Sequence, residues 1–127
     1  MQNSAALAYQ QVGKQTVSPR VLEANLLSRA ATQLQRIRDD WETNRTDLSA
    51  ALLFNRKLWT VFLASVTSDE SKLPRDLREN VGNLGLFVMK HTMAMQSQPE
   101  ARKLDVLINI NRELAAGLRA SAEALER

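Results

Sequence analysis

The sequence predicts an all-α fold, namely a small four-helix bundle-like single domain over residues 18–127 that follows a mobile N-terminal arm over residues 1–17. Apolar residues recur at spacings of three and four along most of the chain, which is the pattern of a buried helix face. The three prolines each precede one of these stretches, and proline is favoured at a helix start. A length of 127 residues, with 44% hydrophobic and 24% charged residues, suits one globular core.

The segment 1–17 differs in composition from the rest of the chain. It is rich in glutamine and other uncharged polar residues, which is typical of segments that cannot bury enough surface to fold alone. Its main apolar residues are Leu7, Ala8, Tyr9 and Val12. We therefore expect a mobile arm here, and whether it orders on binding a partner stays open.

The first helix is expected from Pro19 to about Glu42. Ser18 can cap it, because a serine hydroxyl at this position accepts a hydrogen bond from a backbone N–H of the first turn. Its apolar stripe consists of Leu27, Ala30, Leu34, Ile37 and Trp41.

The second helix is expected to begin at a cap on Thr46 or Asp47 and to end near Val66. Apolar residues cover more than one of its faces, which predicts that it is the central helix of the bundle. Residues 67–72 are polar and have no helical period, so they predict a loop.

The third helix is expected after Leu73 and Pro74. Its apolar stripe of Leu77, Val81, Leu84 and Val88 is widened by Leu86, Phe87 and Met89, which predicts a mostly enclosed helix. Gly82 and Gly85 lie inside it, where each glycine costs about 1 kcal/mol relative to alanine. We expect close helix packing to compensate, with a helix break near Gly82 as the alternative.

The fourth helix is expected to start near Pro99. Its apolar seam has the three-and-four spacing of a heptad, and Asn111 interrupts it. The seam consists of Leu104, Leu107, Asn111, Leu114, Leu118, Ser121 and Leu125.

The composition argues against an enzyme. The chain has no cysteine and a single histidine, His91, so it has few ligands for a transition metal. It has no nucleophile elbow and no phosphate-binding glycine loop. We expect no catalytic residues, no metal and no cofactor, and we interpret His91 as an ordinary half-buried or surface helix residue.

Charge and hydropathy indicate a cytoplasmic protein that does not insert into membranes. The net charge is only +3, and the basic residues form no tail or stripe, so direct nucleic-acid binding is permitted but not indicated. The start of the chain lacks the basic and apolar runs of a signal peptide, and no apolar run is long enough to span a bilayer.

Apolar surface in the second and third helices allows two interpretations. Trp59, Phe62 and Phe87 can be core residues, which is the more common outcome. Alternatively, two helices that are apolar over more than half their circumference leave a groove in which a partner helix can lie.

Six motifs follow one another along the chain. They are Ala8-Tyr9-Gln10, Ser18-Pro19-Arg20-Val21-Leu22-Glu23-Ala24, Asn55-Arg56-Lys57-Leu58-Trp59-Thr60, Leu73-Pro74-Arg75-Asp76-Leu77-Arg78, Leu84-Gly85-Leu86-Phe87-Val88 and Leu107-Ile108-Asn109-Ile110-Asn111-Arg112. No single motif is specific, but their order and spacing together make a chance match improbable. Taken together, they resemble the FlaF family of flagellar biosynthesis regulatory proteins over about residues 8–118.

The resemblance implies a small cytoplasmic, non-enzymatic protein needed for flagellin production and export. Its implied partners are flagellin, whose amphipathic helical ends stay unpaired until assembly, and the regulator FlbT. We therefore expect an export chaperone that holds a terminal segment of flagellin between the second, third and fourth helices. The alternatives are a post-transcriptional regulator that acts with FlbT on flagellin mRNA and a homodimer formed through the fourth helix.

The candidate flagellin-binding residues come from the matched motifs and from the apolar surface of the second and third helices. Asn55 and Asn111 fall on or beside apolar stripes, so they either fix the helix register against each other or bond a partner's backbone. Arg56 and Arg112 can pair with partner carboxylates, although solvated arginines are commoner. The full set is Asn55, Arg56, Trp59, Phe62, Phe87, Asn111 and Arg112.

Overall fold

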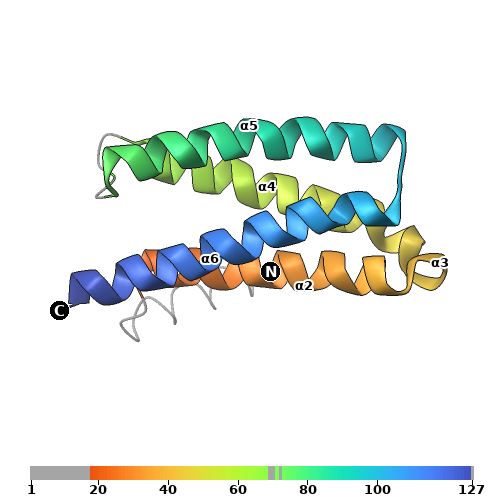
Figure 1. Cartoon of the computed structure of the whole chain (residues 1–127), viewed down its shortest axis with the longest axis horizontal. Helices are drawn as coiled ribbons and strands as arrows, with labels where there is room; N and C mark the ends of the chain where they lie inside the picture. The colour runs from red at the N-terminus through yellow and green to blue at the C-terminus, as the bar shows by residue number, and fades with distance from the viewer. Residues whose placement is uncertain (1–17, 69–70, 72, 127) are drawn as a thin grey trace, which may run out of the picture.

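Four long helices make up most of the computed structural model, which describes residues 18–68, 71 and 73–126 (Figure 1). They are α2 (Pro19–Asp39), α4 (Leu48–Thr67), α5 (Arg75–Ser97) and α6 (Leu104–Glu126). The predicted all-α bundle is therefore confirmed. The predicted mobile arm over residues 1–17 lies outside the described residues.

The helix starts agree only partly with the proline pattern. Pro19 opens α2, and the Ser18 hydroxyl accepts a hydrogen bond from the backbone N–H of Val21 at 3.2 Å, as expected. Pro74, in contrast, is the residue before α5 and has an extended ψ of 147°. Pro99 precedes a short 3-10 turn, η2 (Ala101–Lys103), and α6 begins only after it. The expectation that the third helix follows Pro74 is thus confirmed, whereas the fourth helix begins later than expected from Pro99.

The first helix ends earlier than expected because the chain turns at Asp40, whose φ of −134° and ψ of 65° are not helical. A four-residue helix, α3 (Trp41–Asn44), and a 3-10 turn, η1 (Arg45–Asp47), complete the connection to α4. Asp47 precedes α4 as predicted, but its side chain makes no capping bond and instead forms an ion pair with Arg36 at 3.3 Å.

The helices pack as two pairs. α2 lies along α6, and α4 lies along α5, while α2 also contacts α4 (Figure 1). Small buried residues, including Ala24, Ala31 and Ala115, let the α2 and α6 backbones approach closely. The backbones of α5 and α6 stay farther apart than those of α2 and α6.

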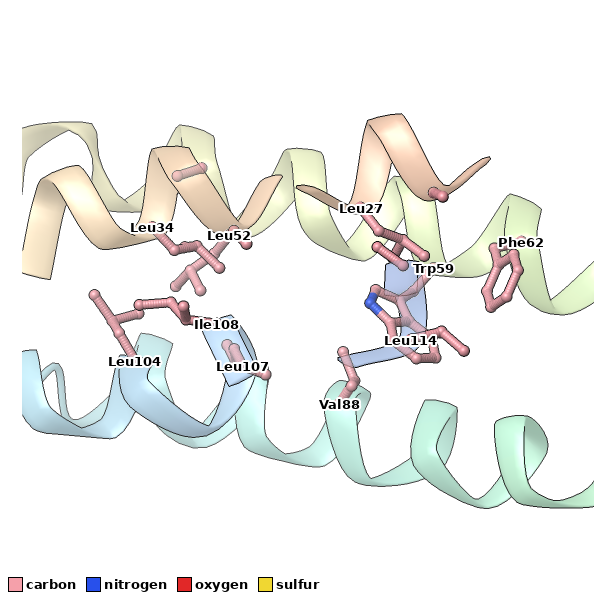
Figure 2. Packing of buried hydrophobic residues seen from close by; sticks show 14 of the residues in the cluster. Leu27, Leu34, Leu52, Trp59, Phe62, Val88, Leu104, Leu107, Ile108 and Leu114 are labelled. Carbon is pink, nitrogen blue, oxygen red and sulfur yellow. The ribbon is translucent and has the colours of Figure 1, made fainter. Parts of the chain in front are cut away.

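One hydrophobic core runs along the inside of all four long helices, and Trp59 of α4 lies near its middle. Figure 2 shows the Trp59 ring among Leu27, Val88 and Leu114, which come from α2, α5 and α6. Phe62 meets the Trp59 ring edge to face, with 5.6 Å between ring centroids. Trp59 and Phe62 are buried as core residues, but α4 packs mainly against α5 and α2 and its Val61 is 70% exposed, so it is not the enclosed central helix that its apolar faces predicted.

The third predicted helix is continuous through both glycines, as expected. Only Gly85 packs closely, however, since an added Cβ there would lie 2.5 Å from Leu63 Cδ1. An added Cβ at Gly82 would meet nothing within 4 Å, so packing does not compensate there. The helix is also less enclosed than predicted, because Leu86 and Met93 on its outer side are 64% and 66% exposed.

Candidate functional site

A chain of hydrogen bonds in the core joins the two helix pairs. The indole Nε1–H of Trp59 donates to Oδ1 of Asn111 at 2.9 Å, and Nδ2 of Asn111 donates to Oδ1 of Asn55 at 2.7 Å. All three side chains have no exposed surface. We call this set the Trp59–Asn111–Asn55 relay, and it connects α4 to α6 across the bundle.

The direction of the relay follows from the indole. An indole nitrogen can only donate, so the oxygen of Asn111 must face Trp59 and its amide nitrogen must face away. Asn55 then has to present its oxygen to Asn111, which leaves its own amide nitrogen pointing elsewhere. That nitrogen is buried and has no hydrogen-bond partner among the described residues.

The relay fits one of the two roles expected for the asparagines, namely fixing helix register. Its bonds form only when residues 55 and 111 lie opposite each other, and an unpaired buried amide costs about 1 to 3 kcal/mol. A shift of either helix by one turn would leave all three polar groups unpaired. The relay therefore disfavours other registers.

The other candidate residues do not gather on one surface. Phe62 lies in the core beside Trp59, with 1% of its surface exposed. Arg56 is exposed on α4. Arg112 is exposed on α6, where it lines a polar recess of about 310 Å³ with Arg38 and Asp105, on the side that faces α2. The Arg38 guanidinium pairs there with Asp105, and the hydrogen bonds to Asp105 and Asp39 raise the pKa of Arg38.

Phe87 is the candidate residue that combines an apolar side chain with exposure, at 44%. Its ring stacks on His91, with centroids 5.5 Å apart, and the His91 Nε2 lies 2.6 Å from the carbonyl oxygen of Lys103. His91 is thus a partly buried residue that links α5 to η2, directly before α6, in line with its structural interpretation. Phe87 lies on the side of α5 that faces α6.

An apolar groove of about 380 Å³ runs between α5 and α6 on this side. Its lining is mostly aliphatic, with Leu114 and Leu118 buried beneath and Leu77, Leu84 and Ile110 partly exposed along the walls. Phe87 follows Leu84 by three residues on the same helix, but it is not one of the residues that line the groove. The remaining lining residues are Glu113, Gly117 and Ser121.

Two of these residues have features that the fold does not explain. Glu113 is exposed and is the one charged residue among the described residues that line the groove. It has no ion-pair partner among the described residues. Gly117 lies inside α6, where glycine costs about 1 kcal/mol relative to alanine. An added Cβ there would meet nothing within 4 Å, so no intramolecular packing requires a glycine.

Sequence reasoning missed the groove as a set of residues. Leu77, Leu84, Leu114 and Leu118 carry the periodic signal of a core stripe, and periodicity does not tell which side of a stripe is covered. Gly117 was the available signal, since it is a glycine in the interior of the helix that carries the heptad-like seam.

The described residues form neither a metal site nor a membrane span. Within residues 18–68, 71 and 73–126, no cluster of histidine, aspartate and glutamate could hold a metal ion. In the same part of the chain, every helix is too short or too polar to cross a bilayer.

A family model described as flagellar protein FlaF matches residues 5–118. The chain belongs to the FlaF family. The match includes α2, α4 and α5 entirely and α6 as far as Leu118, so it covers the relay and every lining residue of the groove except Ser121. No curated protein and no solved structure matches the chain. Membership of the FlaF family makes this a flagellar protein.

Proposed function

We propose that this FlaF protein is a non-enzymatic flagellar biogenesis factor that binds flagellin as a cytoplasmic export chaperone and so supports flagellin synthesis and secretion. The observation that carries the proposal is the apolar groove between α5 and α6 in a protein of a flagellar family. Grooves of this kind take the apolar face of an amphipathic helix. A terminal segment of flagellin, which is helical and unpaired before assembly, has that chemistry.

The groove lies between two of the three helices expected to hold flagellin. The expected binding role of Phe87 is compatible with its place beside the groove and its 44% exposure. Trp59, Phe62 and the asparagines act indirectly in this proposal, because they are buried and hold α4 and α6 in register. Arg56 and Arg112 lie outside the groove lining, so the proposal does not need them.

Calorimetric titration with flagellin from the same organism tests the proposal. Leu84→Glu places a charge in the groove wall, whereas Leu86→Glu makes the same change on the same helix at a 64% exposed position outside the groove lining. We expect saturable binding by the unaltered protein, a loss of affinity of about tenfold or more in Leu84→Glu, and little change in Leu86→Glu. Circular dichroism melts establish that both variants fold.

Deleting each terminal segment of flagellin in turn identifies the end that is bound. The proposal is wrong if intact flagellin does not bind, or if both substitutions weaken binding equally. In that case FlbT becomes the next titrant, since the alternative function is post-transcriptional regulation with FlbT on flagellin mRNA. Direct contact with RNA would then show as an affinity that falls steeply with salt.

A further inference from the structure

The shape of the groove limits how an occupant can lie in it. A helix with its side chains is about 10 Å wide, so an open groove of about 380 Å³ admits a few side chains rather than a whole helix. A helical occupant must therefore lie over the groove and direct its apolar side chains inward. The distance between its backbone and α6 then depends on the residues along the α6 edge.

That edge is formed by small residues at the spacing of one helical turn. Gly117 and Ser121 are four residues apart, so they lie on the same face of α6, and both line the groove. Gly117 is exposed and leaves the α6 backbone uncovered, with open space where a Cβ would be. Small residues at a crossing let two helices approach more closely than large ones do.

The carboxylate of Glu113, beside this edge, sets a preference for the charge of the occupant. Glu113 lies one turn before Gly117, is exposed, and has no ion-pair partner among the described residues. A carboxylate at the border of an apolar groove attracts a lysine or arginine on the occupant and disfavours an acidic residue.

We propose that the groove binds an amphipathic helix that crosses α6 closely at Gly117 and Ser121, places its large apolar side chains between Leu84 and Leu114, and carries a lysine or arginine opposite Glu113. This inference rests on the proposed function, because it takes a terminal segment of flagellin as the source of the helix. It also gives Gly117 a role, because the contact with the partner helix would offset the helix propensity that this glycine costs.

A graded series at Gly117 tests the close crossing. Gly117→Ala and Gly117→Leu add side chains of increasing size where the folded protein has open space, so both variants are expected to fold. Gly82→Ala and Gly82→Leu are matched controls, because Gly82 is also inside a helix with open space around it but lies beside Arg75 and Arg78, away from the groove. The probe is purified flagellin, intact and as its terminal peptides.

We expect flagellin affinity to fall a few-fold in Gly117→Ala and by about tenfold or more in Gly117→Leu, with both Gly82 variants unchanged. Glu113→Lys should weaken binding more than Glu113→Gln, and the difference should shrink at high salt. Melting temperatures should rise in both alanine variants, by about 3 to 6 °C.

The outcomes separate this inference from the function on which it rests. If flagellin binds and Gly117→Leu binds it as tightly as the unaltered protein, the close crossing is refuted while the chaperone function stands. If the unaltered protein binds no form of flagellin, both proposals fail. Equal effects of Glu113→Lys and Glu113→Gln on binding would refute the pairing of Glu113 with a lysine or arginine of the partner.

Discussion

The two sides of α6 are packed in opposite ways. Toward α2, α6 packs along most of its length, and the Arg119 guanidinium donates to Asn25 Oδ1 at 3.0 Å and to Ser28 Oγ at 3.1 Å. Toward α5, the same helix leaves an apolar groove of about 380 Å³. A single heptad-like seam therefore serves a closed contact and an open one. The difference shows that an apolar stripe can be continuous in sequence while only part of it is covered within the chain.

The relay connects the closed pair to the rest of the bundle, so its loss should have the largest effect on stability. Asn111→Ala removes the central member and leaves the Trp59 N–H and the Asn55 oxygen without partners in the core. We expect the free energy of unfolding to fall by about 2 to 4 kcal/mol. Chemical denaturation measures this value.

Asn109→Ala is the matched control, because Asn109 is an exposed asparagine on the same helix. A change within about 0.5 kcal/mol is expected there. Comparable changes in both variants would mean that the buried hydrogen bonds of the relay add nothing to stability, since the gain in helix propensity on Asn→Ala is the same at both positions.

The contrast between the two sides of α6 can be tested by adding volume to each. Ala115 is fully buried and lies one turn before Arg119, on the side that faces α2. Ala115→Leu should destabilise the protein by about 1 to 3 kcal/mol, because that side has no room for a larger side chain. Thermal or chemical unfolding gives the value.

Two further leucine variants on α6 are controls for Ala115→Leu. Ala116→Leu, at an exposed position, should change stability by less than about 0.5 kcal/mol. Gly117→Leu, on the open side, should not lower it, because an added Cβ meets no neighbour. Tolerance of Ala115→Leu would contradict the description of the α2 side as closed.

The smallest expected effects are those of alanine substitutions at Gly117, on the open side of α6, and at Gly85, which packs closely. Gly117→Ala should stabilise the protein by up to about 1 kcal/mol, since it gains helix propensity without a clash. Gly85→Ala should gain less or lose stability, because its Cβ would lie 2.5 Å from Leu63 Cδ1 and that side chain must move. Differential scanning calorimetry of the two variants checks the order, and equal gains would argue against close packing at Gly85.

The sequence predicted the helices better than their surroundings. Local signals placed the start of α2, since the Ser18 cap and Pro19 act within one turn, and Pro74 placed the start of α5. The link between Asn55 and Asn111 was anticipated as one of two options, because polar residues on apolar stripes need partners.

The groove could not be derived in the same way. Whether Leu84 and Leu114 are covered depends on how far apart α5 and α6 lie, and that distance is set by packing elsewhere in the bundle. The small residues between α2 and α6 draw α6 toward α2, which a single helix pattern does not reveal. The end of α2 at Asp40 likewise depends on a turn that propensity alone does not locate.

We propose that the open side of α6 is the surface that receives flagellin. The most direct test is methyl NMR of the protein with and without saturating flagellin. We expect the signals of Leu84, Ile110 and Leu114, which line the groove, to shift strongly, while the signals of Leu27 and Leu34 in α2 change little. Unchanged groove methyl signals in the presence of bound flagellin would show that flagellin binds elsewhere on the protein.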